Sequence, residues 1–296
     1  MKVLLAGASG LVGTALRGHL EGAGHQVRRL VRGAGSDAGP AAYAWNPAAG
    51  QVPGEAVSWA EAVISLNGAP LARPAHTPGR RTVLVSSRVN SAAALAGGIA
   101  ASSDQPEVWI SASAVGFYGD RGEERLTEAA SPGQGFLSQL VQDWEAATVR
   151  AQPTCRVVLG RLGVVLAGEG ALARLVQLAR FGLAGRIGSG RQYWSWIGVQ
   201  DTCRAIDCVL THQELTGPVN LVSPNPVRQC DLSAALARQL GRPRQIPVPA
   251  WAVKVGLGAP AEMLLASQRA VPAALERVGF GFECGDLDDA VGRALG

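Results

Sequence analysis

Glycines near the N-terminus have the spacing of a phosphate-binding turn. Residues 7–13 read GASGLVG and lie between an apolar strand pattern at 2–6 and a helix pattern at 11–23. Glycine is needed at such a junction for the tight turn, for close approach of the backbone to a pyrophosphate and for helix–sheet packing. The helix N-terminus adds N–H groups and a positive dipole end. We therefore expect a dinucleotide phosphate site formed by Gly7, Ser9, Gly10, Leu11, Val12 and Gly13.

Arginines at the end of the second expected strand bear on the choice of dinucleotide. A site for NAD(H) carries Asp or Glu about 20 residues after the glycines, where it binds the ribose hydroxyls. In this chain that position is Arg32, and the nearest acid beyond it is Asp37. Arg29 and Arg32 offer planar guanidinium groups to a 2′-phosphate. We expect NADP(H) rather than NAD(H); the alternative is that these arginines only solvate the strand end.

Further residues are expected to contact the same cofactor. Asn67, Gly68 and Ala69 follow the strand expected at 62–66, and small residues there let the backbone approach the adenosine ribose. We also assign to this site Arg88, in a helix pattern at 80–102, and Ser111, in the strand expected at 108–113.

Two hydroxyl side chains are candidates for catalysis. Ser113 ends a strand, at the edge where ligands of parallel sheets bind, and it could orient a carbonyl or hydroxyl. The alternative is a serine that caps a loop. Tyr118 could act as an acid–base residue, or it could be a half-buried aromatic whose hydroxyl has a backbone partner. Without an adjacent lysine its pKa should keep the ordinary value of a phenol, which suits neutral pH poorly.

Three charged residues are candidates for binding an anionic substrate. Arg161 and Arg191 follow elements that should border the same cleft, and a guanidinium suits a diphosphate or a carboxylate. Glu128 could take a proton from the substrate. The alternatives are a surface arginine at Arg191 and a solvated or capping carboxylate at Glu128.

Composition narrows the classes of function. The chain has 296 residues, with 27 basic and 23 acidic side chains, and its basic residues are dispersed, so we do not expect nucleic-acid binding. Five cysteines without a C-x-x-C pair predict neither a disulfide framework nor a metal site, which fits a cytoplasmic setting. The longest uncharged run, residues 38–54, is short and contains three prolines, so no membrane span is expected.

Strand patterns alternate with helix patterns over much of the chain, which predicts βαβ units and a parallel sheet. We expect an α/β fold with a Rossmann-type doubly wound sheet in residues 1–165, to which residues 197–223 return. Residues 166–296 should form a smaller C-terminal substrate lobe that ends in a module at 243–296. The other expected elements are strands at 26–31, 156–161 and 218–222 and helices at 136–150, 170–183 and 201–212.

Several motifs together resemble those of extended short-chain dehydrogenases/reductases, which include nucleotide-sugar epimerases and dehydratases. They are GASGLVG, NGA at 67–69, ISASAVGFYG at 110–119 and LTEAASP at 126–132. The resemblance implies chemistry by a serine and a Tyr-x-x-x-Lys pair, in which the lysine lowers the pKa of the tyrosine. This chain lacks the pair, because Phe136 and Leu140 stand at its positions.

Longer segments resemble an atypical group of that family, the NADP-dependent epimerase family proteins. Examples are SRVNS at 87–91, FLSQLVQDWEAA at 136–147 and SQRAVPAALERVGFGF at 267–282. The resemblance covers nearly the whole chain and implies NADP(H) binding and the group's own C-terminal module. The chain departs from it at Gly198, where relatives usually carry His, and in the loop at 70–81.

Two classes of function remain open. One is an NADP(H)-dependent oxidoreductase or epimerase that acts on a small anionic, nucleotide-sugar-like metabolite, which Ser113, Tyr118 and the arginines favour. The other is a non-catalytic, redox-responsive regulatory protein that binds NADPH, which the missing pair favours. The segment VNSAAALAGGIAAS at 89–102 suits close helix packing, either within the chain or across a homodimer.

Overall fold

A seven-stranded parallel sheet forms the centre of the computed structural model, which describes residues 1–33, 41–71, 78–180, 182, 184–242, 246–258 and 261–295. In order across the sheet, the strands are β11 (Gly217–Leu221), β7 (Arg156–Leu162), β5 (Val108–Ala114), β4 (Ala62–Ser65), β1 (Lys2–Ala6), β2 (Gln26–Arg32) and β3 (Ala42–Trp45). Every neighbouring pair is parallel. Since β1 lies between β2 and β4, the sheet has the switch point of a doubly wound fold there.

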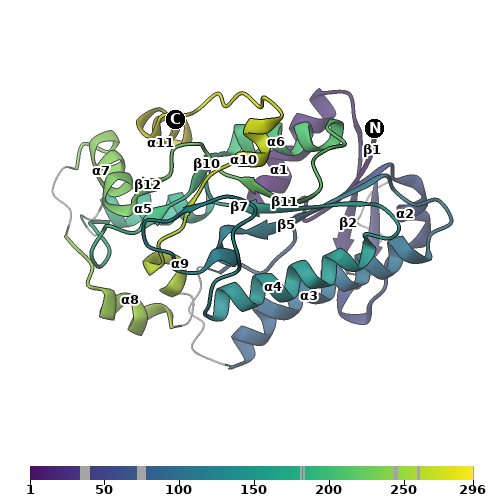
Figure 1. Ribbon diagram of the computed structural model, residues 1–296, viewed down its shortest axis with the longest axis horizontal. Coiled ribbons are helices and arrows are strands. Elements are labelled where there is room, and N and C mark those ends of the chain that lie inside the picture. The colour runs from purple at the N-terminus through teal and green to yellow at the C-terminus, as the bar shows by residue number, and fades with distance from the viewer. Residues whose placement is uncertain are drawn as a thin grey trace.

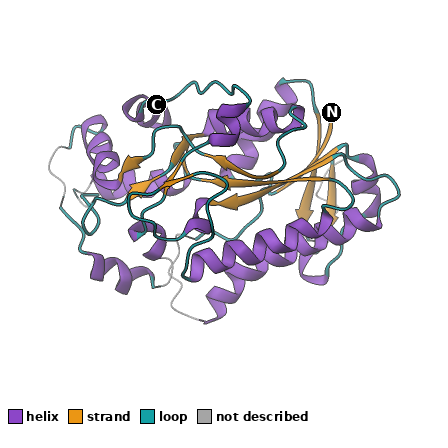
Figure 2. Ribbon diagram, in the orientation of Figure 1, coloured by secondary structure: helices purple, strands orange, loops and turns teal. Residues whose placement is uncertain are grey.

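Helices cover both faces of the sheet (Figures 1 and 2). Helices α3 (Pro78–Ala101) and α4 (Phe136–Thr148) lie side by side on one face, together with α2 (Gly54–Trp59). The other face carries α1 (Leu11–Gly22), α6 (Val199–Thr211) and α10 (Ala273–Arg277). The expected doubly wound α/β fold is confirmed.

The buried strands explain why the sheet could be recognised in the sequence. In β1, Val3 and Leu5 pack toward α1 and α6, whereas Leu4 and Ala6 pack toward α3. Successive side chains of a strand point to opposite faces, so a strand covered on both sides is apolar throughout. The expected strands accordingly lie within one or two residues of the observed ones.

Helix α3 is long and apolar enough, by length and composition alone, to cross a membrane over residues 79–101. Its residues Ala92, Leu95 and Ile99 are buried in the core between α3 and the sheet. Helix α4 lies along its side (Figure 1). This burial is typical of a core helix in a folded domain.

The C-terminal lobe has its own apolar core, which includes Leu172, Trp194, Trp196 and Leu232. Its helices are α5 (Gly170–Arg180), α7 (Gln229–Gln239), α8 (Ala250–Leu257), α9 (Glu262–Leu265) and α11 (Leu287–Leu295). Its short strands are β8 (Val164–Leu166), β9 (Tyr193–Trp194), β10 (Trp196–Gly198), β12 (Val227–Arg228) and β13 (Arg269–Ala270), and β13 pairs with β6 (Arg125–Leu126) from beyond the end of β5.

The chain passes between the lobe and the sheet more than once. β11 joins the edge of the sheet beside β7, after the lobe has begun. The proposed domain boundary at residue 165 therefore stays a prediction. Residues 72–77 of the divergent loop, and residues 243–245, 259–260 and 296 of the C-terminal module, lie outside the described residues.

Candidate functional site

The glycine-rich turn is too tight for side chains at two of its glycines. Gly7 has a φ of 85°, and a Cβ there would lie 2.8 Å from the backbone N of Asn67. A Cβ on Gly13 would lie 2.1 Å from the carbonyl oxygen of Gly7. The N–H of Gly10 donates to the same oxygen at 3.1 Å, which closes the turn. Only glycine fits at these two positions.

The first turn of α1 is arranged to receive an anion. The helix begins at Leu11, its N-cap is Gly10 without a side-chain cap, and no acidic residue lies in its first turn. The N–H groups of Leu11, Val12 and Gly13 have no carbonyl partner within the helix, because the first N–H groups of any helix lack one. Ser9 is exposed on the turn just before them. These groups and the positive helix end fit a pyrophosphate.

A cavity of about 840 Å³ reaches Asn67, whose backbone lies against Gly7 of this turn. Arg32 and Gly33 line it at the end of β2, and Asn67 and Gly68 line it after β4. The rest of its wall comes from the end of β3, from the segment after β3 and from α3. These residues are Ala44, Trp45, Asn46, Pro47, Ala48, Gln51, Val52, Pro53, Val83, Ser86, Ser87, Asn90 and Ser91.

The two arginines expected to bind a 2′-phosphate lie on different faces of β2. Arg32 reaches the cavity, on the same face as Leu30 and Arg28. Arg28 stacks over the ring of Trp59 at 4.3 Å, so its guanidinium is already engaged. Arg29 alternates with these residues and points to the opposite face of the strand. The geometry therefore supports Arg32 alone as the phosphate-binding arginine.

The loop after β4 holds a buried, unpaired acceptor on Asn67, a residue that lines the cavity. Among the described side chains, the Oδ1 atom of Asn67 is buried without a hydrogen-bond partner, while its Nδ2 donates to the carbonyl of Ser87 at 3.4 Å. The next residues are fixed by Ser87, whose Oγ accepts from the N–H of Ala69 at 3.0 Å. A ligand hydroxyl or amine would satisfy the free acceptor.

Arg88 supports this loop from behind instead of lining the cavity. Its guanidinium donates to the carbonyls of Leu84 (3.1 Å) and Ala69 (3.0 Å) and lies over the ring of Trp144. Its Cζ is 3.0 Å from where a Cβ on Gly68 would be. Burial, with a smaller effect of nearby Arg80, lowers the pKa of Arg88 to about 10. The side chain stays charged at neutral pH and holds the loop in place.

Ser111 is out of reach of a cofactor, contrary to expectation. It is fully buried in the middle of β5 and faces α4, where its Oγ accepts from Ser65 at 3.3 Å and from Thr148 at 3.4 Å. Strand β5 continues to Ala114, so only its last residues reach the edge of the sheet.

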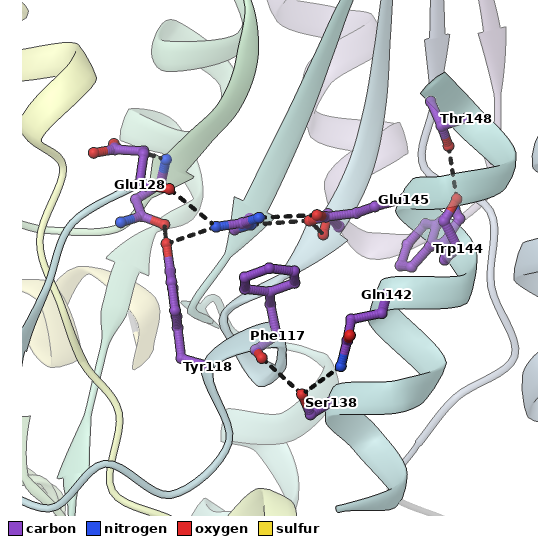
Figure 3. Close-up of polar contacts among 11 residues, drawn as sticks. Phe117, Tyr118, Glu128, Ser138, Gln142, Trp144, Glu145 and Thr148 are labelled. Atoms are coloured by element: carbon purple, nitrogen blue, oxygen red, sulfur yellow. Dashed lines mark hydrogen bonds and ion pairs between the residues drawn. The ribbon is translucent and has the colours of Figure 1, made fainter. Parts of the chain in front are cut away.

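Ser113 and Arg161 belong to a buried ion-pair network around Glu145, and Figure 3 shows this network with Glu145 and Tyr118 labelled. Arg161 donates through Nε and Nη2 to the two carboxylate oxygens of Glu145, each at 2.9 Å, and Ser113 donates to Glu145 at 2.5 Å. The side chains of Arg161 and Glu145 are only 4% and 9% exposed. The guanidinium also lies 3.5 Å from the ring centre of Phe117. The positive charge of Arg161, expected to bind substrate, is thus already matched by Glu145, which sequence reasoning missed.

Tyr118 is part of the same network and has no exposed surface. Its hydroxyl donates to Asn220 Oδ1 at 2.7 Å and accepts from Arg161 at 3.1 Å (Figure 3). Burial raises its pKa, and the charge of Arg161 only partly opposes this. A proton-transfer role for Tyr118 does not fit this geometry. Glu128 accepts from the backbone N–H groups of Asn220 (3.0 Å) and Ala274 (3.1 Å), so it ties α10 to the sheet.

Other expected positions lie apart from the cavity. Arg191 is exposed on the turn before β9, where its carbonyl accepts from Arg228 at 2.7 Å. Phe136 and Leu140, at the positions of the missing Tyr and Lys, pack in an apolar cluster with Leu84 and Leu137. Within the described ranges, no group of three or more His, Cys, Asp or Glu could hold a metal ion.

Comparison with known proteins places these features in a family. Residues 3–221 match the NAD dependent epimerase/dehydratase family. The chain belongs to this family. Residues 248–294 also match a domain of unknown function, DUF1731, so the expected C-terminal module is a recognised unit.

Its relatives include proteins that match along their whole length. An epimerase family protein of Mycobacterium leprae, ML0860, is 40% identical over 99% of this chain and 95% of its own length. The crystal structure of human epimerase family protein SDR39U1 with NADPH is 28% identical, covers 100% of this chain and 99% of that chain, and has a TM-score of 0.90. A nucleoside-diphosphate sugar epimerase from Corynebacterium glutamicum is 34% identical, with a TM-score of 0.82 over 100% of this chain and 58% of that one.

Proposed function

We propose that the protein binds NADP(H) and uses it as an oxidoreductase or epimerase on a small metabolite in the cytoplasm. The observation that supports this cofactor is the cavity lined by Arg32 and by Asn67, whose backbone lies against Gly7, in the turn that leads to the uncapped start of α1. The human relative crystallised with NADPH supports the same cofactor. When bound, the nicotinamide would supply a donor or acceptor of hydride. Five free cysteines fit a reducing compartment.

The residues of this chain would divide the work of binding. The N–H groups that begin α1 hold the pyrophosphate, Arg32 pairs with the 2′-phosphate, and Asn67 accepts from a hydroxyl or amine. The substrate class is suggested by a relative, the nucleoside-diphosphate sugar epimerase of Corynebacterium glutamicum. A nucleotide-sugar-like, anionic metabolite is therefore our proposed substrate.

Titration of NADPH and NADH, followed by nicotinamide fluorescence, tests the cofactor. The wild-type protein should prefer NADPH, and Arg32→Ala should weaken NADPH binding by about 10- to 100-fold, because a charge-assisted contact to phosphate is lost. NADH binding should stay unchanged. Arg29→Ala is the matched control, since Arg29 points to the other face of β2. Equal wild-type affinities for NADPH and NADH would contradict the proposal.

A second candidate function is a regulatory protein that binds NADPH without turnover. The buried network favours it, since Ser113 and Tyr118 are both bonded inside the protein. Consumption of NADPH in the presence of UDP-sugars, or conversion of a UDP-sugar to its epimer without net consumption, would favour the enzyme. If Ser113→Ala and Tyr118→Phe both leave the rate of hydride transfer unchanged, neither residue is catalytic. Tight NADPH binding with neither consumption of NADPH nor epimerisation of any offered metabolite would favour the regulator.

A further inference from the structure

The C-terminal module brings a carboxylate to the first turn of α4. Glu262 begins α9, and its Oε2 accepts from the backbone N–H of Leu137 at 3.2 Å. Gly135, just before α4, has a φ of 101°, and a Cβ there would lie 2.8 Å from the same oxygen. A glycine at this position therefore leaves room for the carboxylate. The N–H of Leu137 and the positive end of α4 stabilise its negative charge.

Helix α9 packs near the loop after β4, and that loop lines the cofactor cavity at Gly68. Met263, the residue after Glu262, packs in the apolar cluster of Leu84 and Leu140, together with Ala69 and Leu71 of the loop after β4. Two of the residues that line the cavity, Gly68 and Val83, are immediate sequence neighbours of that cluster. Arg32 lines the cavity on the other side of β1.

The direction in which a dinucleotide must lie across the sheet relates Glu262 to one end of the cofactor. Ligands of doubly wound sheets bind across the carboxyl ends of the strands at the switch point, here between β1 and β4. With the adenosine end at Arg32 and the pyrophosphate at α1, the nicotinamide end extends past β4 toward β5 and the start of α4. Glu262 is the carboxylate that the C-terminal module contributes beside that helix start.

We propose that Glu262 faces the nicotinamide end of the bound cofactor and sets the charge preference there. Its negative charge favours the positively charged ring of NADP⁺ over the neutral ring of NADPH, and it disfavours an anionic group of the substrate at this end. The reacting end of the substrate is then neutral, and any anionic group binds farther away. Arg81, whose guanidinium lies 5.3 Å from the ring centre of Phe136, is a cation at the same start of α4 and opposes this field. The inference rests on the proposed function.

The ratio of the dissociation constants for NADP⁺ and NADPH tests this proposal without any substrate. Glu262→Gln removes the charge but keeps an oxygen that can accept from Leu137. We expect this variant to raise the ratio by about 3- to 10-fold, as the loss of one screened charge implies. Glu276→Gln is the matched control, because Glu276 is an exposed carboxylate of α10 in the same module. It should leave the ratio unchanged.

The outcomes separate this inference from the proposed function. An unchanged ratio in Glu262→Gln, or equal weakening of both forms, would mean that Glu262 only caps α4. That result overturns this inference and leaves the proposed function standing. A wild-type protein that binds neither NADP⁺ nor NADPH overturns both.

Discussion

The pairing of Arg161 with Glu145 joins β7 to α4 beneath the carboxyl edge of the sheet. Each buried charge is tolerated because the other neutralises it and because Ser113 and Tyr118 complete the hydrogen bonds. Removal of one partner leaves an uncompensated charge in the core, and this lowers the free energy of unfolding by far more than the intact pair contributes to it. We therefore expect the main role of the network to be in the stability of the fold.

Glu145→Ala tests this expectation. The free energy of unfolding, measured by urea denaturation, should fall by about 3–5 kcal/mol, because Arg161 is left buried and unpaired. Glu124→Ala is the control: the Arg121–Glu124 pair has a similar distance of 2.7 Å but an exposed carboxylate. It should cost only about 0–1 kcal/mol. A similar loss of unfolding free energy in the two variants would show that the buried pair stabilises the fold no more than the exposed pair does.

At the residue scale, the sequence predicted the roles of residues whose partners are near in the chain. It missed the roles of residues whose partners lie on other elements. The glycine turn was predictable because Gly7 and Gly13 act within one strand–turn–helix unit. Arg161 looked available for substrate because its partner, Glu145, lies on a different element. Tyr118 looked reactive because its partner Asn220 is 102 residues away in the chain.

NADPH binding is expected to depend most directly on the geometry of the junction between β1 and α1. Gly13→Ala would place a methyl group 2.1 Å from the carbonyl oxygen of Gly7, so α1 must move away from the turn. We expect NADPH affinity to fall by more than about tenfold and the free energy of unfolding by about 1–3 kcal/mol. Fluorescence titration and urea denaturation measure the two effects.

Gly18→Ala, in the same helix, is the control for this prediction. Gly18 is exposed, and a Cβ there meets nothing within 4 Å. Alanine is favoured over glycine inside a helix, so this variant should be more stable by about 0.5–1 kcal/mol and bind NADPH normally. If Gly13→Ala also bound NADPH normally, the turn would not be the phosphate site.

At the element scale, apolar runs made the central strands predictable, whereas β3 and α2 were missed. These two elements are short and lie in a segment where Pro40, Pro47 and Pro53 break any regular pattern. The end of β3 and the segment between these two elements form the wall of the cavity near Arg32, so the sequence predicted the arginine without the pocket around it. The contact of α9 with α4 was also invisible, since it joins residues 125 positions apart.

At the scale of the whole molecule, the distribution of exposed apolar side chains indicates which surface a homodimer could use. The exposed residues of α4 are Gln139, Asp143 and Ala146, and the first two are polar. The most exposed large apolar residues among those described, Ile246, Trp251 and Val255, lie instead at α8 or just before it. A dimer formed through α3 and α4 stays a prediction, and it would have to use a largely polar face of α4.

The reactivity of the five cysteines shows whether the protein could sense redox state through its own thiols. All are free, and burial is the main cause that raises each pKa: to about 11 for Cys155, Cys203 and Cys284, and in the same direction for Cys208 and Cys230. The thiolate is the reactive form, so a raised pKa means little reaction near neutral pH and a rate that increases as the pH rises toward that value. Iodoacetamide labelling of the folded protein at about pH 8, followed by mass spectrometry, should therefore be at least about tenfold slower than labelling of the urea-unfolded chain. A cysteine that reacts rapidly at neutral pH would contradict the expected slow labelling and would favour a thiol switch. If all five cysteines label slowly, a regulatory protein that binds NADPH would have to sense redox state through NADP(H) binding instead.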